Sequence, residues 1–456
     1  MSRLLISAAH KSSGKTTVTL GLCAAVAARG TQVQPFKKGP DYIDPMWLGQ
    51  AAGHACYNLD FYCMSRDEIL GTVARYSQKS DLALIEGNKG LYDGLDLDGS
   101  NSNAALATLT NSPVILVIDA RGMTRGIAPM ILGYQAFDPD VHIAGVILNQ
   151  LGGSRHEAKL RAVIEHYTDV PVLGGVHRHA DLVIDERHLG LIPSNEATAV
   201  TAKIDMIRQH IDAQVDIERL LAIAAATDPL DFSVPVTDST PPGSPLRIGI
   251  ARDAAFGFYY PDDLEAMERA GAQLVPFDTL HDSALPPVDG LFIGGGFPES
   301  CMAELEANTA LRHDLRTAIE NGLPCYAECG GLMYLSRSLT WADRTCEMVG
   351  VIPADTVMHT RPQGRGYVRL RERPAARWPG APAGGEIAAH EFHYSALVNL
   401  DGEQEFAYEV LRGTGIDGRH DGILLHNLLA CYSHMRDTAG HHWVGRFLDF
   451  VRARQR

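Results

Sequence analysis

Apolar segments in the first half of the chain alternate with segments of helical pattern. The segment VTLGLCAAVAARG, which ends at Gly30, and the segment from Arg155 to His166 are expected helices. The strand-like segments are RLLISAA, QVQPFKKG, DLALIEG, SPVILVIDARG, HIAGVILNQ and VPVLGGV. Most are apolar along nearly their whole length, which is typical of strands buried on both faces. Such strands in alternation with helices predict a parallel sheet covered by helices on both sides.

The second half of the chain restarts the same pattern after a proline-rich break at residues 228–246. Its expected elements are the strand LRIGIARD, the helix DDLEAMERAG, and the strands AQLVPFD, DGLFIGGG and LPCYAECGG, with later strand-like segments from GYVRL through EIAAHEFHYSALV to EFAYEV that extend the sheet. The break reads as a linker. We therefore predict an α/β protein with two doubly wound domains, residues 1–227 and 247–456, joined by the linker 228–246.

Composition narrows the class of protein. The fractions of hydrophobic residues (45%) and charged residues (21%) are those of an ordinary globular chain. No apolar run approaches the roughly 18 residues that span a bilayer, and the N-terminus lacks a secretory signal, so we expect a cytoplasmic protein with no membrane partner. The net charge of −15 disfavours a nucleic-acid partner. None of the eight cysteines forms a Cys-x-x-Cys pair, which argues against a zinc site or a disulfide framework.

The segment SSGKTT follows the first expected strand and opens the first expected helix. Backbone amides at a helix N-terminus bind phosphate oxygens, so this context predicts a phosphate-binding loop. Gly14, Lys15, Thr16 and Thr17 are the candidate nucleotide-binding residues: Lys15 would reach the terminal phosphates and Thr16 would ligate magnesium. The match is imperfect, because the first glycine of the usual motif is replaced by Ala9. The competing interpretation is a chance Gly-Lys-Thr at a helix start.

Charged residues follow several of these strands. The candidate nucleotide- and metal-binding acids are Asp41, Asp44, Glu86, Asp93 and Asp119. Strand carboxyl ends are where open α/β sheets bind ligands, and Mg²⁺ prefers hard oxygen ligands. Taken singly, each acid is more often a cap or turn residue. Five cations in the same loops suggest either an anion-binding rim or ordinary solvated charge: Lys37, Lys38, Lys89, Arg121 and Arg125.

Cys329 lies at a turn between an expected strand and an expected helix, followed by Gly330 and Gly331. This pattern resembles the strained turn that presents a nucleophile at the top of a sheet. The upstream GLFIGGGFPE could supply backbone amides for an oxyanion hole. A thiolate also needs a histidine, and the residues leave several open: His390, His393, His420, His426, His434, His441 and His442. The competing interpretation is a buried structural cysteine.

Long strings of the sequence resemble a known family, the cobyrinate a,c-diamide synthases, which are glutamine-dependent amidotransferases. The resemblance covers nearly the whole chain. The strings that carry it are SGKTTVTLGL, FKKGPDYIDP, YNLD, EGNKGLYDG, VILVIDARGMTRG, AGVILNQ, ERHLGLIPS, ARDAAFGFYYPDDLE, GGGFPE and YAECGGLMYL.

The resemblance implies a carbon–nitrogen ligase with two linked active sites. The first domain would be a dethiobiotin-synthetase-like ATP site that uses Mg²⁺ and converts a carboxylate of the acceptor into an acyl phosphate. The second would be a class I glutaminase that takes ammonia from L-glutamine through a cysteine thioester. The implied acceptor is a tetrapyrrole polycarboxylate amidated on its a and c acetate side chains, with cobyrinate as the first choice.

The resemblance also assigns roles to individual residues. Thr16, Asp44 and Glu86 match the metal-binding positions, and Asp41, Asp44 and Asp93 match substrate-binding acids. Lys89, in the same loop as Asp93, is a further candidate substrate-binding residue. The nucleophile and its histidine match Cys329 and His434. The expected oxyanion hole beside this nucleophile consists of Gly295, Gly296 and Gly330. The usual third acid of class I glutaminases would stand at position 436. Arg436 occupies it, so the resemblance implies a Cys-His dyad.

Departures from the family pattern leave the acceptor open. His10 and Lys11 replace small residues of the phosphate loop, and Asn88 and Lys89 stand where apolar residues are common. Sirohaem and sirohydrochlorin, with or without nickel, are therefore the alternative acceptors. Two rival functions are a partitioning or regulatory ATPase with a passive glutaminase-like domain, and a ligase that aminates a nucleotide as CTP synthase does. The oligomeric state is open, with a homodimer as one alternative.

Overall fold

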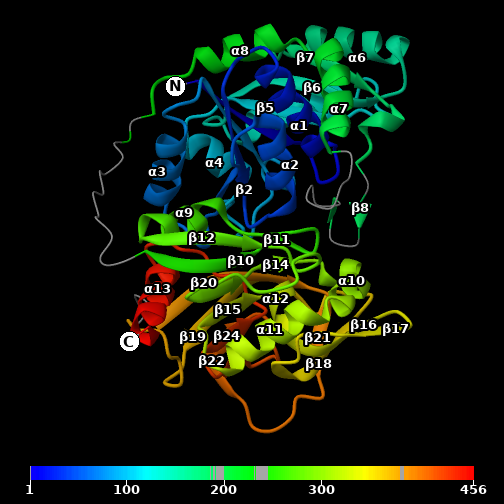
Figure 1. Ribbon diagram of the computed structural model, residues 1–456. Helices are drawn as coiled ribbons and strands as arrows, with labels where there is room; N and C mark the ends of the chain where they lie inside the picture. The colour runs from blue at the N-terminus through cyan, green and yellow to red at the C-terminus, as the bar shows by residue number, and fades with distance from the viewer. Residues whose placement is uncertain are drawn as a thin grey trace. The chain divides into compact units, whose positions relative to one another are not determined.

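The computed structural model describes residues 2–184, 186–187, 190–191, 200–230, 232, 245–380 and 385–455. It divides into two compact units, Met1–Phe61 with Ser65–Val236, and Tyr62–Met64 with Thr237–Arg456 (Figure 1). The predicted linker and the ERHLGLIPS string lie largely outside the described residues, and the predicted domain boundaries stay a prediction. Within the described part of the chain, no helix has the length and apolar character needed to cross a membrane.

A seven-stranded sheet forms the centre of the first unit, in the order β3-β2-β4-β1-β5-β6-β7. Its strands are β1 (Ser2–Ala8), β2 (Val33–Lys38), β3 (Tyr57–Leu59), β4 (Leu82–Glu86), β5 (Val114–Asp119), β6 (Ile143–Leu151) and β7 (Val172–His177). All of its strand pairs are parallel, as predicted. After β1 the chain forms β2, β3 and β4 on one side of β1, and then β5, β6 and β7 on its other side. Ligands bind at such a switch point in open α/β sheets.

The direction of each crossover decides which face its helix covers. Right-handed connections put the helices after β1 and β2 on one face and those after β5 and β6 on the other. The packing agrees, because α1 contacts α2 and α7 whereas α5 contacts α6. The helices are α1 (Lys15–Ala27), α2 (Ile43–Ala52), α3 (Arg66–Tyr76), α4 (Asn103–Leu109), α5 (Ile127–Phe137), α6 (Ser154–Tyr167), α7 (Val200–Gln214) and α8 (Ile217–Ala225), with a 3₁₀ turn η1 (Ala180–Leu182) and a short hairpin β8 (Glu186–Arg187) and β9 (Gly190–Leu191).

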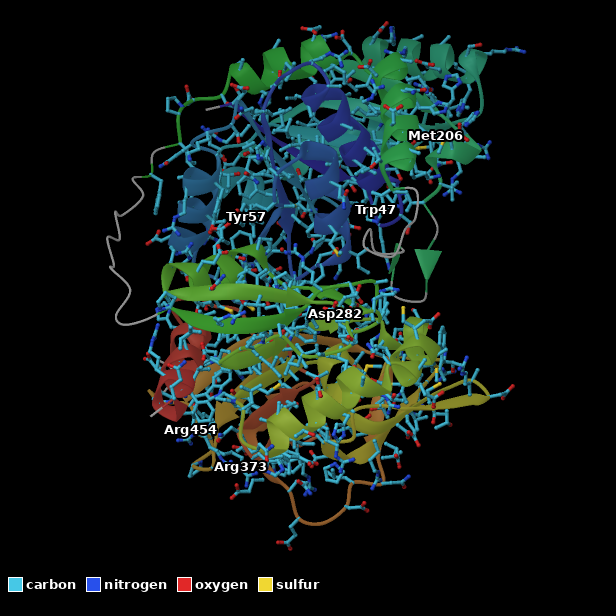
Figure 2. All side chains as sticks on the ribbon, viewed as in Figure 1. Trp47, Tyr57, Met206, Asp282, Arg373 and Arg454 are labelled. Carbon is cyan, nitrogen blue, oxygen red and sulfur yellow. The ribbon has the colours of Figure 1, made fainter. Side chains whose placement is uncertain are left out.

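Helix α1 has no polar face, and its residues from Val18 to Val26 are all buried. A helix that is apolar all round belongs in a protein interior, and α1 lies between the sheet and α7 (Figure 1). The large side chains Trp47 of α2 and Tyr57 of β3 are buried in the same unit (Figure 2). The phosphate-loop segment thus starts a helix fixed on every side.

The second unit contains a nine-stranded sheet in the order β12-β10-β13-β15-β24-β23-β22-β19-β20. Its strands are β10 (Leu246–Ala251), β12 (Ala272–Phe277), β13 (Gly290–Ile293), β15 (Cys325–Glu328), β19 (Gly364–Glu372), β20 (Glu386–His393), β22 (Glu405–Arg412), β23 (His420–Leu425) and β24 (Leu428–Cys431). The first five strands in this order are parallel, and the remaining pairs are antiparallel. The predicted extension of the sheet by the later strands is therefore confirmed for GYVRL, EIAAHEFH and EFAYEV.

Two smaller sheets complete the second unit. β11 (Phe256–Phe258) pairs with β14 (Gly295–Gly296), and a four-stranded sheet has the order β17-β16-β18-β21. The expectation that SALV extends the main sheet is wrong, because β21 (Ser395–Val398) pairs with β18 (Ile352–Met358) in the four-stranded sheet. The other elements are β16 (Ser336–Trp341), β17 (Arg344–Glu347), η2 (Pro298–Cys301), α9 (Pro261–Arg269), α10 (Met302–Ala307), α11 (Thr309–Glu320), α12 (Gly330–Leu335) and α13 (Trp443–Arg454).

Helix α12 packs so closely on β13 that a glycine is required at their contact. A Cβ atom on Gly331 would lie 2.2 Å from the backbone oxygen of Ile293, which cannot move away as a side chain can. Gly445 on α13 offers the opposite case, because a Cβ atom there meets nothing within 4 Å. The two glycines therefore form a matched pair for testing the packing of this unit.

We expect Gly331→Ala to lower the free energy of unfolding of the second unit by about 1–3 kcal/mol through overpacking. Gly445→Ala should raise it by about 0.5–1 kcal/mol, because alanine loses less conformational entropy in a helix. Urea unfolding of the two variants beside the parent protein measures both shifts. Equal stability of Gly331→Ala and the parent would contradict the close approach of α12 and β13.

Candidate active sites

The phosphate-loop segment connects β1 to α1 and is fixed by a side chain from β6. Gly14 has φ +79°, and a Cβ atom there would lie 2.1 Å from Asn149 Nδ2. Asn149 is buried and donates a hydrogen bond from this atom to the backbone oxygen of Ser13, at 2.8 Å. Asn149 was not among the predicted site residues, because its contact with Ser13 joins segments that are far apart in the chain. The loop therefore needs a glycine both for its backbone conformation and for the space that Asn149 occupies.

Lys37, on β2, is the centre of a buried cluster of charges beside the start of α1. Its ammonium donates to Asp44 Oδ2 and, at 2.9 Å, to Glu86 Oε1. Lys15 Nζ lies 3.6 Å from the same Glu86 oxygen. Thr16 Oγ1 lies 2.7 Å from that oxygen and 3.2 Å from Asp44 Oδ2. The predicted loop residues Lys15 and Thr16 thus meet the predicted acids Asp44 and Glu86 around a lysine.

Burial and charge together decide the ionisation of this cluster. Burial alone would lower the pKa of Lys37, but Asp44 and Glu86 outweigh it and raise that pKa well above its ordinary value. Burial lowers the pKa of Lys15, against the opposing effect of Glu86. Burial would raise the pKa of Asp44, but Lys37 outweighs burial and lowers it. Burial and the neighbouring Asp44 raise the pKa of Asp41 to about 7.

The oxygen atoms of this cluster suit a magnesium ion. Glu86 is fully buried, and its Oε2 atom has no hydrogen-bond partner among the described residues. Leaving a buried carboxylate oxygen unpaired is costly, so such an atom marks a place for a ligand. Thr16 Oγ1, which bonds the other Glu86 oxygen, and Asp44 Oδ2 supply two further hard oxygens, which is the donor chemistry that Mg²⁺ prefers. The residues present therefore fit the ion that a nucleotide site requires.

The other predicted substrate residues lie in two loops. Asp41 Oδ1 accepts hydrogen bonds from the backbone nitrogens of Ile43 and Asp44, at 3.0 and 3.1 Å, and so fixes the start of α2. Asp93 is exposed and accepts from the backbone nitrogen of Gly90 at 2.9 Å. Lys89 is exposed with φ 44°, in the left-handed region that non-glycine residues rarely adopt. Asp41 and Asp93 both shape the loops in which they stand.

Asn103, at the start of α4, hydrogen-bonds the backbone of the loop that contains Lys89. It is fully buried, and its side-chain oxygen accepts from the backbone nitrogen of Asn88 at 3.1 Å. Its amide donates to the backbone oxygen of Gly90 at 2.8 Å and to Ser7 Oγ on β1 at 3.1 Å. Asn103 was not among the predicted site residues, because a lone asparagine before a helical pattern is indistinguishable from an ordinary cap.

Burial and pairing remove three cations from the predicted anion-binding rim, namely Lys37, Lys38 and Arg121. Lys37 and Lys38 are buried, so they are neither rim residues nor solvated charges. Burial lowers the pKa of Lys38 to about 8, and its ammonium lies 3.2 Å from Asn88 Oδ1. Arg121 is exposed and forms a two-pronged ion pair with Asp119, so this acid is occupied by its own loop and does not join the Lys37 cluster.

Cys329 stands where β15 ends and α12 begins, in a strained backbone conformation with φ 46° and ψ −99°. Its backbone nitrogen donates to the Cys431 oxygen of β24 at 2.8 Å, which holds the turn against the sheet. A Cβ atom on Gly330 would lie 2.9 Å from the backbone nitrogen of Gly296, so the GGG segment passes directly over the turn. A strained nucleophile residue between a strand and a helix is the geometry that the sequence predicted.

Among the candidate histidines, the structure brings His434 to the cysteine. Its ring hydrogen-bonds the Cys329 thiol, and Gly295 approaches the same ring, since a Cβ atom there would lie 2.7 Å from His434 Cε1. The ring of His390 stacks on that of His434, with centroids 4.9 Å apart. His393 lies beside Glu391 instead, at 3.6 Å. The structure thus gathers Cys329, His434 and the predicted oxyanion glycines Gly295, Gly296 and Gly330 in one place.

A third group faces His434, the side chain of Glu328, the residue before Cys329. Its Oε2 atom lies 3.4 Å from His434 Nδ1, and both side chains are buried. Burial alone would lower the pKa of His434, but its interactions with Cys329 and Glu328 outweigh burial and raise that pKa to about 10. Arg436 stands at the position of the usual acid and pairs with Asp262 at 2.7 Å, so that position supplies no acid to His434. The Cys-His dyad stays a prediction, and the carboxylate that faces the His434 ring belongs to Glu328 of β15.

Comparison with known proteins supports this division. The family described as CobQ/CobB/MinD/ParA nucleotide binding domain matches residues 5–191, and the CobB/CobQ-like glutamine amidotransferase domain matches residues 247–439. Among curated proteins, a cobyrinate a,c-diamide synthase of Magnetococcus marinus is 47% identical, with 99% of this chain and 97% of that protein covered. Proteins of the same name from Methanosarcina acetivorans and Archaeoglobus fulgidus are each 40% identical over 98% of this chain, with 95% and 96% of their own lengths covered.

The hydrogen bonds of Asn103 give a test of the first site. We expect Asn103→Ala to lower the free energy of unfolding of the first unit by about 1–3 kcal/mol, because buried partners on Asn88, Gly90 and Ser7 lose their hydrogen bonds. Amide hydrogen exchange at Asn88 should accelerate in the same variant. Unchanged exchange at Asn88 would show that Asn103 does not hold this loop.

Proposed function

The chain belongs to the cobyrinate a,c-diamide synthase family of glutamine-dependent amide ligases, and on that premise we propose that it amidates the a and c acetate side chains of cobyrinate. Each amide would consume one ATP and one glutamine, because each carboxylate needs its own activation. The observation that carries the proposal is the pairing, in one chain, of a strained Cys329 that hydrogen-bonds His434 with a cluster of Lys15, Thr16, Asp44 and Glu86.

In the first unit an acetate oxygen of the acceptor attacks the γ-phosphorus of ATP. The bond from this phosphorus to the bridging oxygen breaks, and ADP leaves with an acyl phosphate formed. Gly14 and the start of α1 offer backbone amides to the phosphates, and the Lys15 ammonium neutralises the charge on the transferred group. A magnesium ion held by Thr16, Asp44 and Glu86 would supply further charge neutralisation to the phosphates. Lys37 orients the two carboxylates.

In the second unit the Cys329 sulfur attacks the side-chain carbonyl of glutamine, and its proton passes to His434. The oxyanion that forms lies against the glycines that surround the turn. His434 then donates the proton to the amide nitrogen, the carbon–nitrogen bond breaks, and ammonia leaves a thioester behind. Water, deprotonated by His434, hydrolyses the thioester to glutamate. Ammonia displaces phosphate from the acyl phosphate, loses one proton and yields the primary amide.

Two substitutions separate these half-reactions. Cys329→Ala should abolish synthesis from glutamine and leave synthesis from ammonium salts intact, because the cysteine only generates ammonia. Lys15→Ala should reduce synthesis from both nitrogen sources about a hundredfold or more, since one electrostatic contact to the reacting group is lost. Product formation with glutamine or ammonium chloride measures both. Glutamine-dependent synthesis by Cys329→Ala, or full ammonia-dependent activity of Lys15→Ala, would overturn the corresponding assignment.

The acceptor is tested by a panel of tetrapyrroles. We expect cobyrinate, with ATP and glutamine, to give first a monoamide and then a diamide, seen by mass spectrometry as successive exchanges of OH for NH₂. Sirohaem and sirohydrochlorin, with and without nickel, serve as the alternatives because Asn88 and Lys89 depart from the common pattern in the acceptor loop. Turnover of sirohaem but not of cobyrinate would overturn the choice of acceptor and leave the proposed mechanism unchanged. Turnover of no tetrapyrrole, with ATP hydrolysed, would favour an ATPase.

A further inference from the structure

Glu328 stands next to the nucleophile in the chain, a position from which a regular strand would point it away. Successive side chains of a strand point to opposite faces, so Glu328 and Cys329 would lie on opposite sides of β15. The φ angle of 46° at Cys329 breaks this alternation. As a result the Glu328 carboxylate and the Cys329 thiol both reach the ring of His434.

The carboxylate is held on its other oxygen by two buried donors. Tyr326 shares a face of β15 with Glu328, and its hydroxyl donates to Glu328 Oε1 at 2.5 Å. The backbone nitrogen of Met435, the residue after His434, donates to the same oxygen at 2.8 Å. Glu328 Oε2 is thereby aimed at His434 Nδ1, 3.4 Å away. One carboxylate thus fixes the end of β15 and the segment of His434 relative to each other.

We propose that Glu328 is the positioning residue of the glutaminase: it orients His434 and stabilises the imidazolium that forms when the Cys329 proton is taken up. With Nδ1 facing the carboxylate, Nε2 is the ring nitrogen available to the thiol. A buried acid performs this service for the histidine of serine proteases, where it is not itself protonated. The proposal rests on the assignment of Cys329 and His434 in the proposed function. It adds an acid from β15, because Arg436 occupies the position at which class I glutaminases usually carry one.

Among the charged groups around His434, Glu328 is the acid whose negative charge can raise the pKa of the ring. Cys329 and Glu328 face the ring from the end of β15, and His390 of β20 stacks on it. Burial, and then the positive charges of His434 and Arg436, hold the pKa of His390 well below its ordinary value, so His390 stays neutral. Arg436 is engaged with Asp262. Removing the Glu328 charge should therefore lower the pKa of His434 from about 10 toward its ordinary value.

The test uses glutamine hydrolysis by the full-length protein, which does not depend on the identity of the acceptor. We expect Glu328→Gln to reduce kcat by on the order of 10²–10⁴-fold, the upper value being the loss for the comparable acid of serine proteases. The alkaline limb of the kcat/KM profile should move to lower pH, because the imidazolium loses its proton more easily. Alkylation of Cys329 by a diazoketone analogue of glutamine, read by mass spectrometry, should slow in parallel.

The matched control is Glu391→Gln. Glu391 is another buried glutamate of the same unit that lies beside a histidine, His393, at 3.6 Å. This control should keep the parent rate and pH profile. Tyr326→Phe removes one donor to Glu328 and should shift the alkaline limb in the same direction by a smaller amount, which keeps the test valid if Glu328→Gln does not fold.

The outcomes separate the two levels of inference. A parent protein that hydrolyses no glutamine would overturn the proposed function itself. A parent that hydrolyses glutamine, beside a Glu328→Gln variant with the parent rate and pH profile, would overturn the role of Glu328 alone. A folded Glu328→Gln variant that is slower but has an unshifted alkaline limb would overturn it as well, since a merely structural residue behaves in that way. If Glu328→Gln does not fold, an unshifted alkaline limb in Tyr326→Phe would overturn it.

Discussion

The positive charge of Lys37 lies in the interior of the first unit, and the neighbouring functional groups are arranged around it. A buried ammonium is stable only when carboxylates surround it, and Asp44 and Glu86 do so from α2 and β4. Those carboxylates in turn meet Thr16 and Lys15 at the start of α1. Four elements are therefore held in register by one side chain. Replacing Lys37 would leave two acids facing each other in a buried space.

The second unit builds its site on backbone strain instead of buried countercharge. The turn at Cys329 is kept in its unfavourable conformation by the Cys431 oxygen and by the close approach of Gly296 to Gly330. Strain of this kind persists only where surrounding packing over-determines it. The parallel strands supply that packing, and the antiparallel extension brings His390 beside His434. Both units thus place their functional groups at the carboxyl ends of strands. The first holds them by buried opposite charges and the second by backbone strain.

Sequence patterns predicted the parallel sheets, the phosphate loop and the nucleophile turn because each is a local signal. Apolar runs reveal buried strands, and a Gly-Lys-Thr or a Cys-Gly-Gly lies within a few residues. The contacts that complete the sites were not predictable, since they join residues far apart in the chain. Asn103 reaches Ser7, and Asn149 reaches Ser13. Glu328 was not predicted for another reason. Side-chain alternation along a strand would point Glu328 away from Cys329, but the alternation fails at Cys329 itself.

Asn103 holds the backbone of the loop that follows β4, while several side chains of this loop stay exposed. It ties the backbone of Asn88 and Gly90 to Ser7 of β1, whereas the side chains of Lys89, Leu95 and Leu97 are exposed, with Leu97 fully exposed. Substitutions of these side chains cost little folding energy, since surface changes usually perturb stability only slightly. The exposed side chains of this loop can therefore change in evolution while the backbone that carries them keeps its place.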